Sequence, residues 1–201
     1  MRKLSLLALL AVVCLATSAF ATTVFDLSPA NAESQFNHDF GPGEGVAVST
    51  TQSISNMEFF LSMPNGGDLK FMIWDGTNSN LLFSNVLTGV QASDTKTWVS
   101  SPDFNFTLTA GNSYFFGVVA DAPVNVGYLF PSKDYSSNGL TAFTSGNAYY
   151  DFFDNPVYDS HNGNEWGLRL DASAVPEPGS IALLGTGVLG LAGVLRRKLM
   201  L

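Results

Sequence analysis

The segment MEFFLSMPNGGDLKFMIWD, residues 57–75, contains two alternating apolar runs joined by a turn sequence. Every second side chain is apolar in residues 57–63, and Leu69, Phe71 and Ile73 share one face of the second run. Period-two alternation is typical of a β-strand with one buried face, and PNGG is typical of a turn. The segment therefore predicts two consecutive strands that each contribute one face to a core.

The same alternation recurs toward the C-terminus, in residues 104–108, 114–120, 124–130 and 165–171. Clusters of Gly, Asn, Asp and Pro separate these runs, and none of the segments between the termini has a helical period. The side chains expected to face inward are Phe104, Phe106, Leu108, Tyr114, Phe116, Val118, Ala120, Val124, Val126, Tyr128, Phe130, Trp166, Leu168 and Leu170. Those expected to face outward near the end are Glu165, Arg169 and Asp171.

Many short strands with frequent turns predict an all-β fold over residues 22–171. We expect a single antiparallel β-sandwich, jelly-roll-like, with about eight to eleven strands; a closed barrel is the alternative. The chain has no internal repeat of fixed period, which argues against a propeller or a solenoid.

The N-terminus has the features of a secretory signal peptide over residues 1–21. Arg2 and Lys3 precede an apolar stretch, and Ala19-Phe20-Ala21 is a small-x-small cleavage sequence. An uncleaved membrane anchor is the alternative, but the apolar stretch is short for a span. The only cysteine, Cys14, lies within this segment, so the mature chain is expected to have no disulfide, cysteine zinc site or thiol nucleophile.

The predicted body is strongly acidic. The whole chain has a net charge of −8, with nine basic and 17 acidic residues, and five of the basic residues lie in the two terminal segments. Nucleic-acid binding needs a basic face, so an acidic body argues against it. An acidic surface is compatible with an exported, soluble domain and with binding of calcium.

The sequence gives little support for catalysis. The two histidines, His38 and His161, stand apart in turn-rich segments, and no G-x-S-x-G nucleophile motif is present. A metal hydrolase would need histidines and carboxylates clustered together. We expect a non-enzymatic protein, with a secreted hydrolase as the least favoured alternative.

One predicted loop, DFFDNPVYDSHNGNE at residues 151–165, is rich in oxygen ligands of the kind that calcium prefers. Its spacing does not match the EF-hand pattern, and a solvated acidic loop is the alternative. A second oxygen-rich turn, WDGTNSN at residues 74–80, is also compatible with an ordinary turn. The candidate calcium ligands of the first loop are Asp151, Asp154, Asp159, Asn162, Asn164 and Glu165.

Aromatic side chains on an outward strand face would suit a glycan. Trp74 and Trp98 fall on the less apolar face of their strands, so they are the candidate glycan contacts. With 16 phenylalanines in the chain, most aromatic rings are instead expected in the core.

The C-terminal region VPEPGSIALLGTGVLGLAGVLRRK, residues 175–198, is Pro-rich, then apolar, then basic. A helix over residues 181–195 would be about 22 Å long, somewhat less than the roughly 30 Å hydrocarbon core. It is apolar on every side, and Arg196, Arg197 and Lys198 follow it as a membrane stop on the cytoplasmic side. We therefore predict a linker at 172–180, a single-pass transmembrane helix at 181–195 and a cytoplasmic basic tail at 196–201.

Together, the signal peptide, VPEP, the Gly-rich apolar stretch and the terminal basic cluster resemble the PEP-CTERM family of exported bacterial proteins. The resemblance covers the last 27 or so residues and the signal peptide, and it implies that exosortase, a membrane transpeptidase, recognises Pro176, Glu177 and Pro178. It further implies a Gram-negative host, residence in the inner membrane before processing, and then a place at the cell surface or in the extracellular matrix of a biofilm with its exopolysaccharide. Because bodies in this family differ widely, a glycan- or calcium-binding module of the matrix stays open as the alternative to a structural matrix protein.

Overall fold

The computed structural model describes residues 22–28, 32–36, 40–77, 80–130, 134–143, 148–151, 153–154, 157–160, 164–172 and 187. All of its strands belong to one compact unit, Thr22–Ser173. The predicted signal peptide and basic tail lie outside the described residues. Of the predicted linker 172–180 only Ala172 is described, and it belongs to the last strand; the predicted span is described only at Gly187. Among the described residues, no helix has the length and apolarity that a membrane crossing requires.

The described part of the unit forms 16 strands, more than the eight to eleven predicted, because it includes several strands of two to five residues. Their bounds are β1 Thr22–Leu27, β2 Ala32–Phe36, β3 Phe40–Val48, β4 Gln52–Ser62, β5 Gly67–Asp75, β6 Leu81–Val90, β7 Thr97–Ser100, β8 Phe106–Leu108, β9 Ser113–Ala120, β10 Val124–Leu129, β11 Tyr135–Ser137, β12 Leu140–Ala142, β13 Ala148–Asp151, β14 Val157–Ser160, β15 Glu165–Trp166 and β16 Leu168–Ala172.

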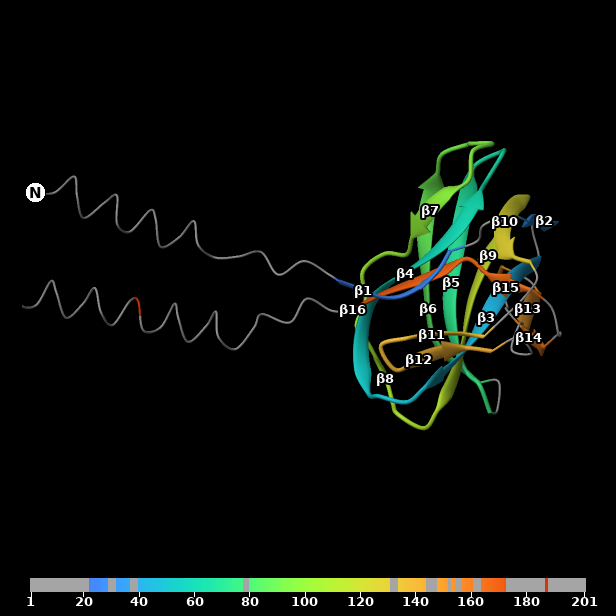
Figure 1. Cartoon of the computed structure of the whole chain (residues 1–201). Helices are drawn as coiled ribbons and strands as arrows, with labels where there is room; N and C mark the ends of the chain where they lie inside the picture. The colour runs from blue at the N-terminus through green and yellow to red at the C-terminus, as the bar shows by residue number, and fades with distance from the viewer. Residues whose placement is uncertain are drawn as a thin grey trace, which may run out of the picture. The chain divides into compact units, whose positions relative to one another are not determined.

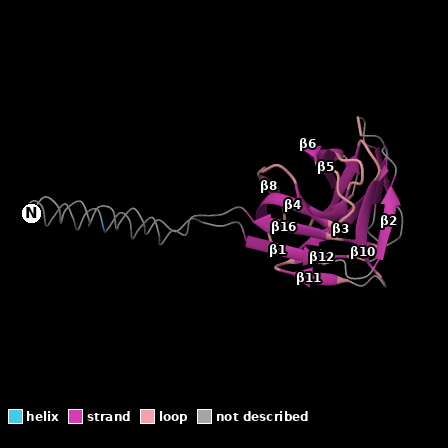
Figure 2. Ribbon diagram, turned by 90° about the horizontal axis from the view of Figure 1, so that it is seen from above, coloured by secondary structure: helices cyan, strands magenta, loops and turns pink. Residues whose placement is uncertain are grey.

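The strands form two eight-stranded antiparallel sheets (Figure 1). Sheet A has the order β1-β16-β4-β10-β15, with β2 beside β10 and with β7 and β8 beside β4. Sheet B has the order β11-β12-β3-β9-β5-β6, with β13 between β3 and β14. The chain passes repeatedly from one sheet to the other, as in a jelly-roll-like sandwich. The predicted all-β sandwich is confirmed, and Figure 2 shows the described part of this unit as strands and loops.

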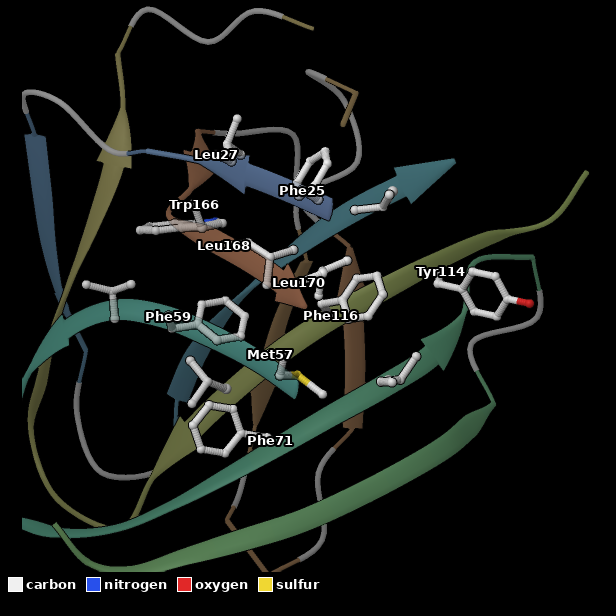
Figure 3. Close-up of a cluster of buried hydrophobic side chains, with 14 of the residues drawn as sticks. Phe25, Leu27, Met57, Phe59, Phe71, Tyr114, Phe116, Trp166, Leu168 and Leu170 are labelled. Atoms are coloured by element: carbon white, nitrogen blue, oxygen red, sulfur yellow. The ribbon is translucent and has the colours of Figure 1, made fainter. Parts of the chain in front are cut away.

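The core lies between the two sheets, where the alternating runs place their apolar side chains. Met57 and Phe59 of sheet A point toward Phe71 and Phe116 of sheet B, and all four are fully buried (Figure 3). Burial of such a side chain contributes roughly 1.5–3 kcal/mol, so a core of this size can stabilise a domain without disulfides. Most of the predicted inward residues are buried here or packed against this core.

The turn of residues 64–67 connects the two sheets rather than two neighbours in one sheet, since β4 lies in sheet A and β5 in sheet B. Gly66 has a φ of 66°, and a Cβ at this position would lie 2.6 Å from the carbonyl oxygen of Val90. The turn therefore needs glycine both for its backbone conformation and for space.

A second, smaller apolar cluster covers part of the outer face of sheet B. It consists of Met72, Trp74, Phe115 and Val119, with Phe143 and Phe153 packed against it. Lys70 donates a hydrogen bond to the carbonyl oxygen of Phe153 and lies 4.8 Å from the centre of its ring. Strands β5 and β9 are thus buried on both faces over this stretch.

Two phenylalanines differ from the sequence expectation. Phe130 is 60% exposed, just beyond the end of β10. Phe104 precedes β8 instead of lying in it, although its ring still packs 4.5 Å from that of Phe83. In both cases the regular strand is shorter than the alternating pattern.

Candidate functional site

The outer face of sheet A carries a group of polar and aromatic side chains that we name the sheet A platform. Its members come from four adjacent strands: Asp26, Glu58, Phe60, Trp98, Ser100 and Arg169. They share a face because each alternates with a core residue of its strand, as Glu58 and Phe60 alternate with Met57, Phe59 and Leu61. The strand register aligns four of them in one row across the sheet.

Hydrogen bonds and charges connect this row. Arg169 lies opposite both Asp26 and Glu58, and its Nε is 2.9 Å from Asp26 Oδ1, while its Nη1 is 3.9 Å from Glu58 Oε2. The hydroxyl of Ser100 donates to Glu58 Oε1 at 2.5 Å. These groups are partly exposed, so each ion pair contributes no more than about 1 kcal/mol to stability. Their main effect is to fix the orientation of the arginine.

Trp98 packs against this arginine. The guanidinium carbon of Arg169 lies 3.9 Å from the centre of the Trp98 ring. The centres of the Phe60 and Trp98 rings are 5.3 Å apart. Trp98 remains partly exposed, as predicted from its place on the less apolar face. An aromatic ring flanked by carboxylate and guanidinium groups offers both an apolar surface and hydrogen-bonding partners to a polar ligand.

The prediction that Trp74 is a surface contact is wrong. Trp74 is only 1% exposed, because Phe143 and Phe153 pack over the second apolar cluster on the outer face of sheet B. The side chain does point away from the main core, as its strand position predicts, but the outer face of sheet B is not a solvent face there.

The candidate calcium residues are divided between the two sheets. Asp151 lies on β13 and Asp159 on β14, where the register places Asp159 opposite Tyr149. Asp154 is exposed, and Asn164 is partly exposed before β15. Asn162, like His38 and His161, lies outside the described residues.

Glu165 belongs to β15 of sheet A, opposite Leu129, and it is fully buried rather than outward-facing. Within the described ranges, no group of three or more His, Cys, Asp or Glu residues is placed to hold a metal ion. In the other oxygen-rich turn, Asp75 Oδ1 accepts hydrogen bonds from the amide and hydroxyl of Thr77, which is the geometry of an ordinary Asx turn.

Glu44, which is not among the residues expected from the sequence, is fully buried inside the sandwich. It lies on β3 opposite the core residue Phe116, in phase with the buried Val46 and Val48. Its Oε2 accepts a hydrogen bond from the backbone amide of Trp166 at 2.8 Å, which connects the two sheets. This alternation with Val46 and Val48 is the signal that could have revealed it.

Burial raises the pKa of Glu44 well above its usual value of 4.5. The backbone amides of Trp166 and Gly45 lower this pKa, and the nearby charge of Glu165 raises it further. Burial disfavours the charged carboxylate because the protein interior solvates it less well than water does. A second buried glutamate, Glu165, thus adds to the effect of burial on Glu44.

The comparisons with known proteins identify one family feature. Residues 174–198 match the family model of the PEP-CTERM protein-sorting motif. This range contains Pro176, Glu177, Pro178 and the cluster Arg196–Lys198, so the resemblance seen in the sequence is confirmed. No curated protein matches the chain.

Among solved structures, the chain is similar to the cysteine protease and lectin-like domains of Cwp84, a surface layer associated protein of Clostridium difficile. The identity is 9% and the TM-score 0.43, and the match covers 74% of this chain and 37% of that chain. It is also similar to a carbohydrate binding module, CBM6cm-2, from Cellvibrio mixtus lichenase 5A in complex with cellotriose. Here the identity is 15% and the TM-score 0.34, with 61% of this chain and 84% of that chain covered.

Proposed function

We propose that this chain, which carries a PEP-CTERM protein-sorting motif at residues 174–198, is an exported protein that exosortase processes at its C-terminus. Its β-sandwich body then acts without catalysis, at the cell surface or in the extracellular matrix. The observation that carries this proposal is the match of the sorting motif. The compact unit Thr22–Ser173 ends before the matched segment begins, which supports the proposal, because a tail that is removed should not contribute to the folded body.

The chemistry of the tail fits a temporary membrane anchor. The apolar residues 181–195 hold the chain in the inner membrane, and the basic cluster 196–198 stays on the cytoplasmic side. Pro-Glu-Pro at 176–178 precedes the apolar stretch, where a membrane transpeptidase can reach it. The body is then released from the anchor into the matrix, where we place it with the exopolysaccharide of a biofilm.

Mass spectrometry of the exported protein tests the processing step. In a host with exosortase, the intact mass should correspond to a chain without the residues after the PEP region. Glu177→Ala should leave the chain unprocessed and in the membrane fraction. Asp154→Ala, which changes an exposed acidic residue of the body, is the control and should be processed normally. A wild-type mature protein that still ends at Leu201 would contradict the proposal.

Glycan binding through the sheet A platform is the second candidate function. The supporting observation is the partly exposed Trp98, whose ring lies against the guanidinium of Arg169, which in turn lies beside the carboxylates of Asp26 and Glu58. An aromatic face beside such groups is the arrangement that binds a sugar ring, which has one apolar face and several hydroxyls. A matrix polysaccharide would be the ligand.

A glycan array with and without calcium tests this second function. Binding to one polysaccharide class is expected, and Trp98→Ala should weaken it by about tenfold or more, as removal of a buried aromatic anchor does in other interfaces. Phe130→Ala removes an exposed aromatic ring outside the platform and should leave binding unchanged. Absence of binding, or equal losses in the two variants, would contradict a glycan site at Trp98.

A further inference from the structure

Strand β6 forms one edge of sheet B, and exposed apolar side chains gather on it. In the described part of the chain, β6 pairs only with β5. Of the four large hydrophobic side chains that are exposed in this part, three lie on β6: Leu81, Leu82 and Val86, with exposed fractions of 45%, 45% and 38%. Single apolar side chains are common at a surface, but three along one open edge indicate a contact surface.

The neighbouring strand does not share this exposure. Met72 and Trp74 of β5 are buried, because Phe143 and Phe153 pack over the second apolar cluster on the outer face of sheet B. Among the described residues, none of those that cover this cluster extends the cover to the exposed side chains of β6. The apolar surface therefore continues from β5 onto β6 without a cover.

The edge of β6 also leaves backbone groups available for pairing. A strand that pairs on one side only directs the N–H and C=O groups of alternate residues away from its neighbour. Pairing between β5 and β6 is regular from Leu69 opposite Leu87 to Ile73 opposite Phe83, and it shifts register at each end. The straight part of the edge is thus residues 83–87, where a further strand can complete the hydrogen bonds.

The charge of the chain restricts which partner fits this edge. Residues 81–90 contain no charged side chain, although the chain has a net charge of −8. Two acidic copies repel each other wherever their carboxylates meet, so an uncharged edge is where a second copy can approach closely. A basic partner would be attracted to the acidic surface instead and would gain nothing from β6.

The straight part of β6 is also compatible with pairing to itself. A two-fold axis at Asn85, its middle residue, places Phe83 opposite Leu87 of the second copy, and Ser84 opposite Val86 of the second copy. Phe83 and Leu87 are only partly buried against the core of their own copy. Apolar pairs opposite each other on adjacent strands stabilise a sheet, so both side chains gain a contact.

We propose that two copies of the body associate by antiparallel pairing of their β6 strands, so that sheet B of one copy continues into sheet B of the other. The contact is isologous, because the same strand is used by both copies. The proposal does not depend on the sorting of the tail or on glycan binding.

The size of this contact sets its strength. At about 3.3 Å per residue, the straight part of the edge is roughly 17 Å long, so the buried area is at the small end for specific interfaces. We therefore expect a weak dimer, with a Kd on the order of 10 μM. Because salt screens the repulsion between the acidic copies, the Kd should be lower at physiological than at low ionic strength.

Sedimentation equilibrium of the purified exported protein tests the association. The mass should change from monomer to dimer around the expected Kd, without larger species, because a two-fold contact is closed. Val86→Glu places a charge on the edge, opposite Lys70 of β5, and should raise the Kd by about tenfold or more. Ala92→Glu adds the same charge at an exposed position beyond β6 and should leave the Kd unchanged.

Cysteine crosslinking tests the geometry without depending on the charged variant. Cys14 is the only cysteine in the chain, so Cys14→Ala provides a background without thiols. In the proposed pair the two Ser84 side chains are diagonal neighbours, about 7–8 Å apart, and a thiol crosslinker of that length should join two Ser84→Cys chains. Ala92→Cys lies far from its counterpart in an antiparallel pair and should remain uncrosslinked.

Three results would overturn the proposal. A monomer at every concentration and ionic strength would show that β6 binds no second copy. Species that continue to grow beyond the dimer would indicate open aggregation and not a two-fold pair. Equal crosslinking of Ser84→Cys and Ala92→Cys, or equal effects of Val86→Glu and Ala92→Glu on the Kd, would place the contact outside β6.

Discussion

At Gly41 the backbone of β9 comes so close to β3 that no side chain fits between them. A Cβ at this position would lie 1.9 Å from the carbonyl oxygen of Val118. The strands would have to separate locally, so Gly41→Ala should lower the free energy of unfolding by about 1–3 kcal/mol or more. Urea unfolding followed by tryptophan fluorescence measures this change.

Gly89 provides the control for Gly41. A Cβ there would meet nothing within 4 Å, but the residue has a φ of 69°. Gly89→Ala should therefore cost only the conformational strain, about 1 kcal/mol. If both variants lost the same stability, the close contact at Gly41 would not be the cause.

Glu44 makes the stability of the protein depend on pH. Its pKa in the folded state is raised above the usual 4.5, so the folded state binds the proton more tightly than the unfolded state does. The stability that protonated Glu44 provides is fully present below pH 4.5 and is lost as the pH rises through the raised folded-state pKa. The carboxyl of Glu165 is the titratable group that acts on it.

Urea unfolding at pH 4.5 and pH 7.5 checks this direction. The wild type should lose more stability between the two pH values than Glu44→Gln, which has no proton to release at this position. Equal losses in the two proteins would mean that Glu44 does not titrate over this range.

Individual residues show what sequence patterns can and cannot predict. The inward positions of Phe59 and Leu170 follow directly from alternation, and they are buried as predicted. Glu165 was expected to face outward because it alternates with the inward residues Trp166 and Leu168, but its position in the fold buries it. Trp74 was expected at the surface because it lies on the outer face of its strand. Alternation predicts that face correctly, but it cannot predict that a later segment covers it.

At the level of elements, β6 is an edge strand with little protection. It lies at the end of the sheet B order, and its residues 81–90 contain no charged residue and no proline. Leu81, Leu82 and Val86 are exposed on it. Proteins usually protect edge strands with charges or prolines, because an open edge can pair with another chain.

A charge on β6 should therefore reduce association of partly unfolded chains. Leu82→Lys is expected to slow the growth of light scattering during refolding on the order of severalfold, with little loss of stability, because Leu82 is 45% exposed. Ala92→Lys adds the same charge at an exposed position beyond the strand and should have a much smaller effect. If the two variants slowed the scattering equally, the cause would be the added net charge and not the position of the charge on the edge strand.

Long strands were predicted better than short ones. Strands β4, β5, β9 and β16 have strong alternation, and their inward faces are as expected. Strands such as β11, β12 and β15 have two or three residues each, too few for a period to be recognised. They form because a neighbouring strand provides hydrogen-bonding partners, which local sequence does not reveal.

At the scale of the whole molecule, the body should fold without the two terminal segments. The unit Thr22–Ser173 is compact by itself, and its core includes the buried Trp166. A chain of residues 22–173 should unfold in urea in one cooperative transition, with a red shift of fluorescence as the buried tryptophans become exposed. A broad, non-cooperative transition would show that the terminal segments are needed for folding.

The class of the fold and the sorting motif could be predicted from the sequence, since both depend on local patterns. The platform on sheet A and the Glu44–Glu165 pair could not, because each joins residues that are far apart in the chain. Arg169 meets Asp26 only because β16 pairs with β1, and Glu44 reaches the amide of Trp166, the neighbour of Glu165, only because the two sheets pack together. Such contacts depend on which strands pair and on how the sheets pack, and not on local sequence.

The pairing of β1 with β16 also has a consequence for timing. The first strand of the body has the last one as its neighbour, with Thr22 opposite Ala172, and β16 also separates β1 from β4. A chain that crosses a membrane amino terminus first cannot complete sheet A until residues 168–172 have emerged. Under the proposed function, the segment after residue 172 would still be in transit at that moment, and the tail would hold the chain at the membrane while its final strand inserts. Cleavage before this point would release an incomplete sandwich. Slow cleavage at the sorting motif would give the body time to complete sheet A.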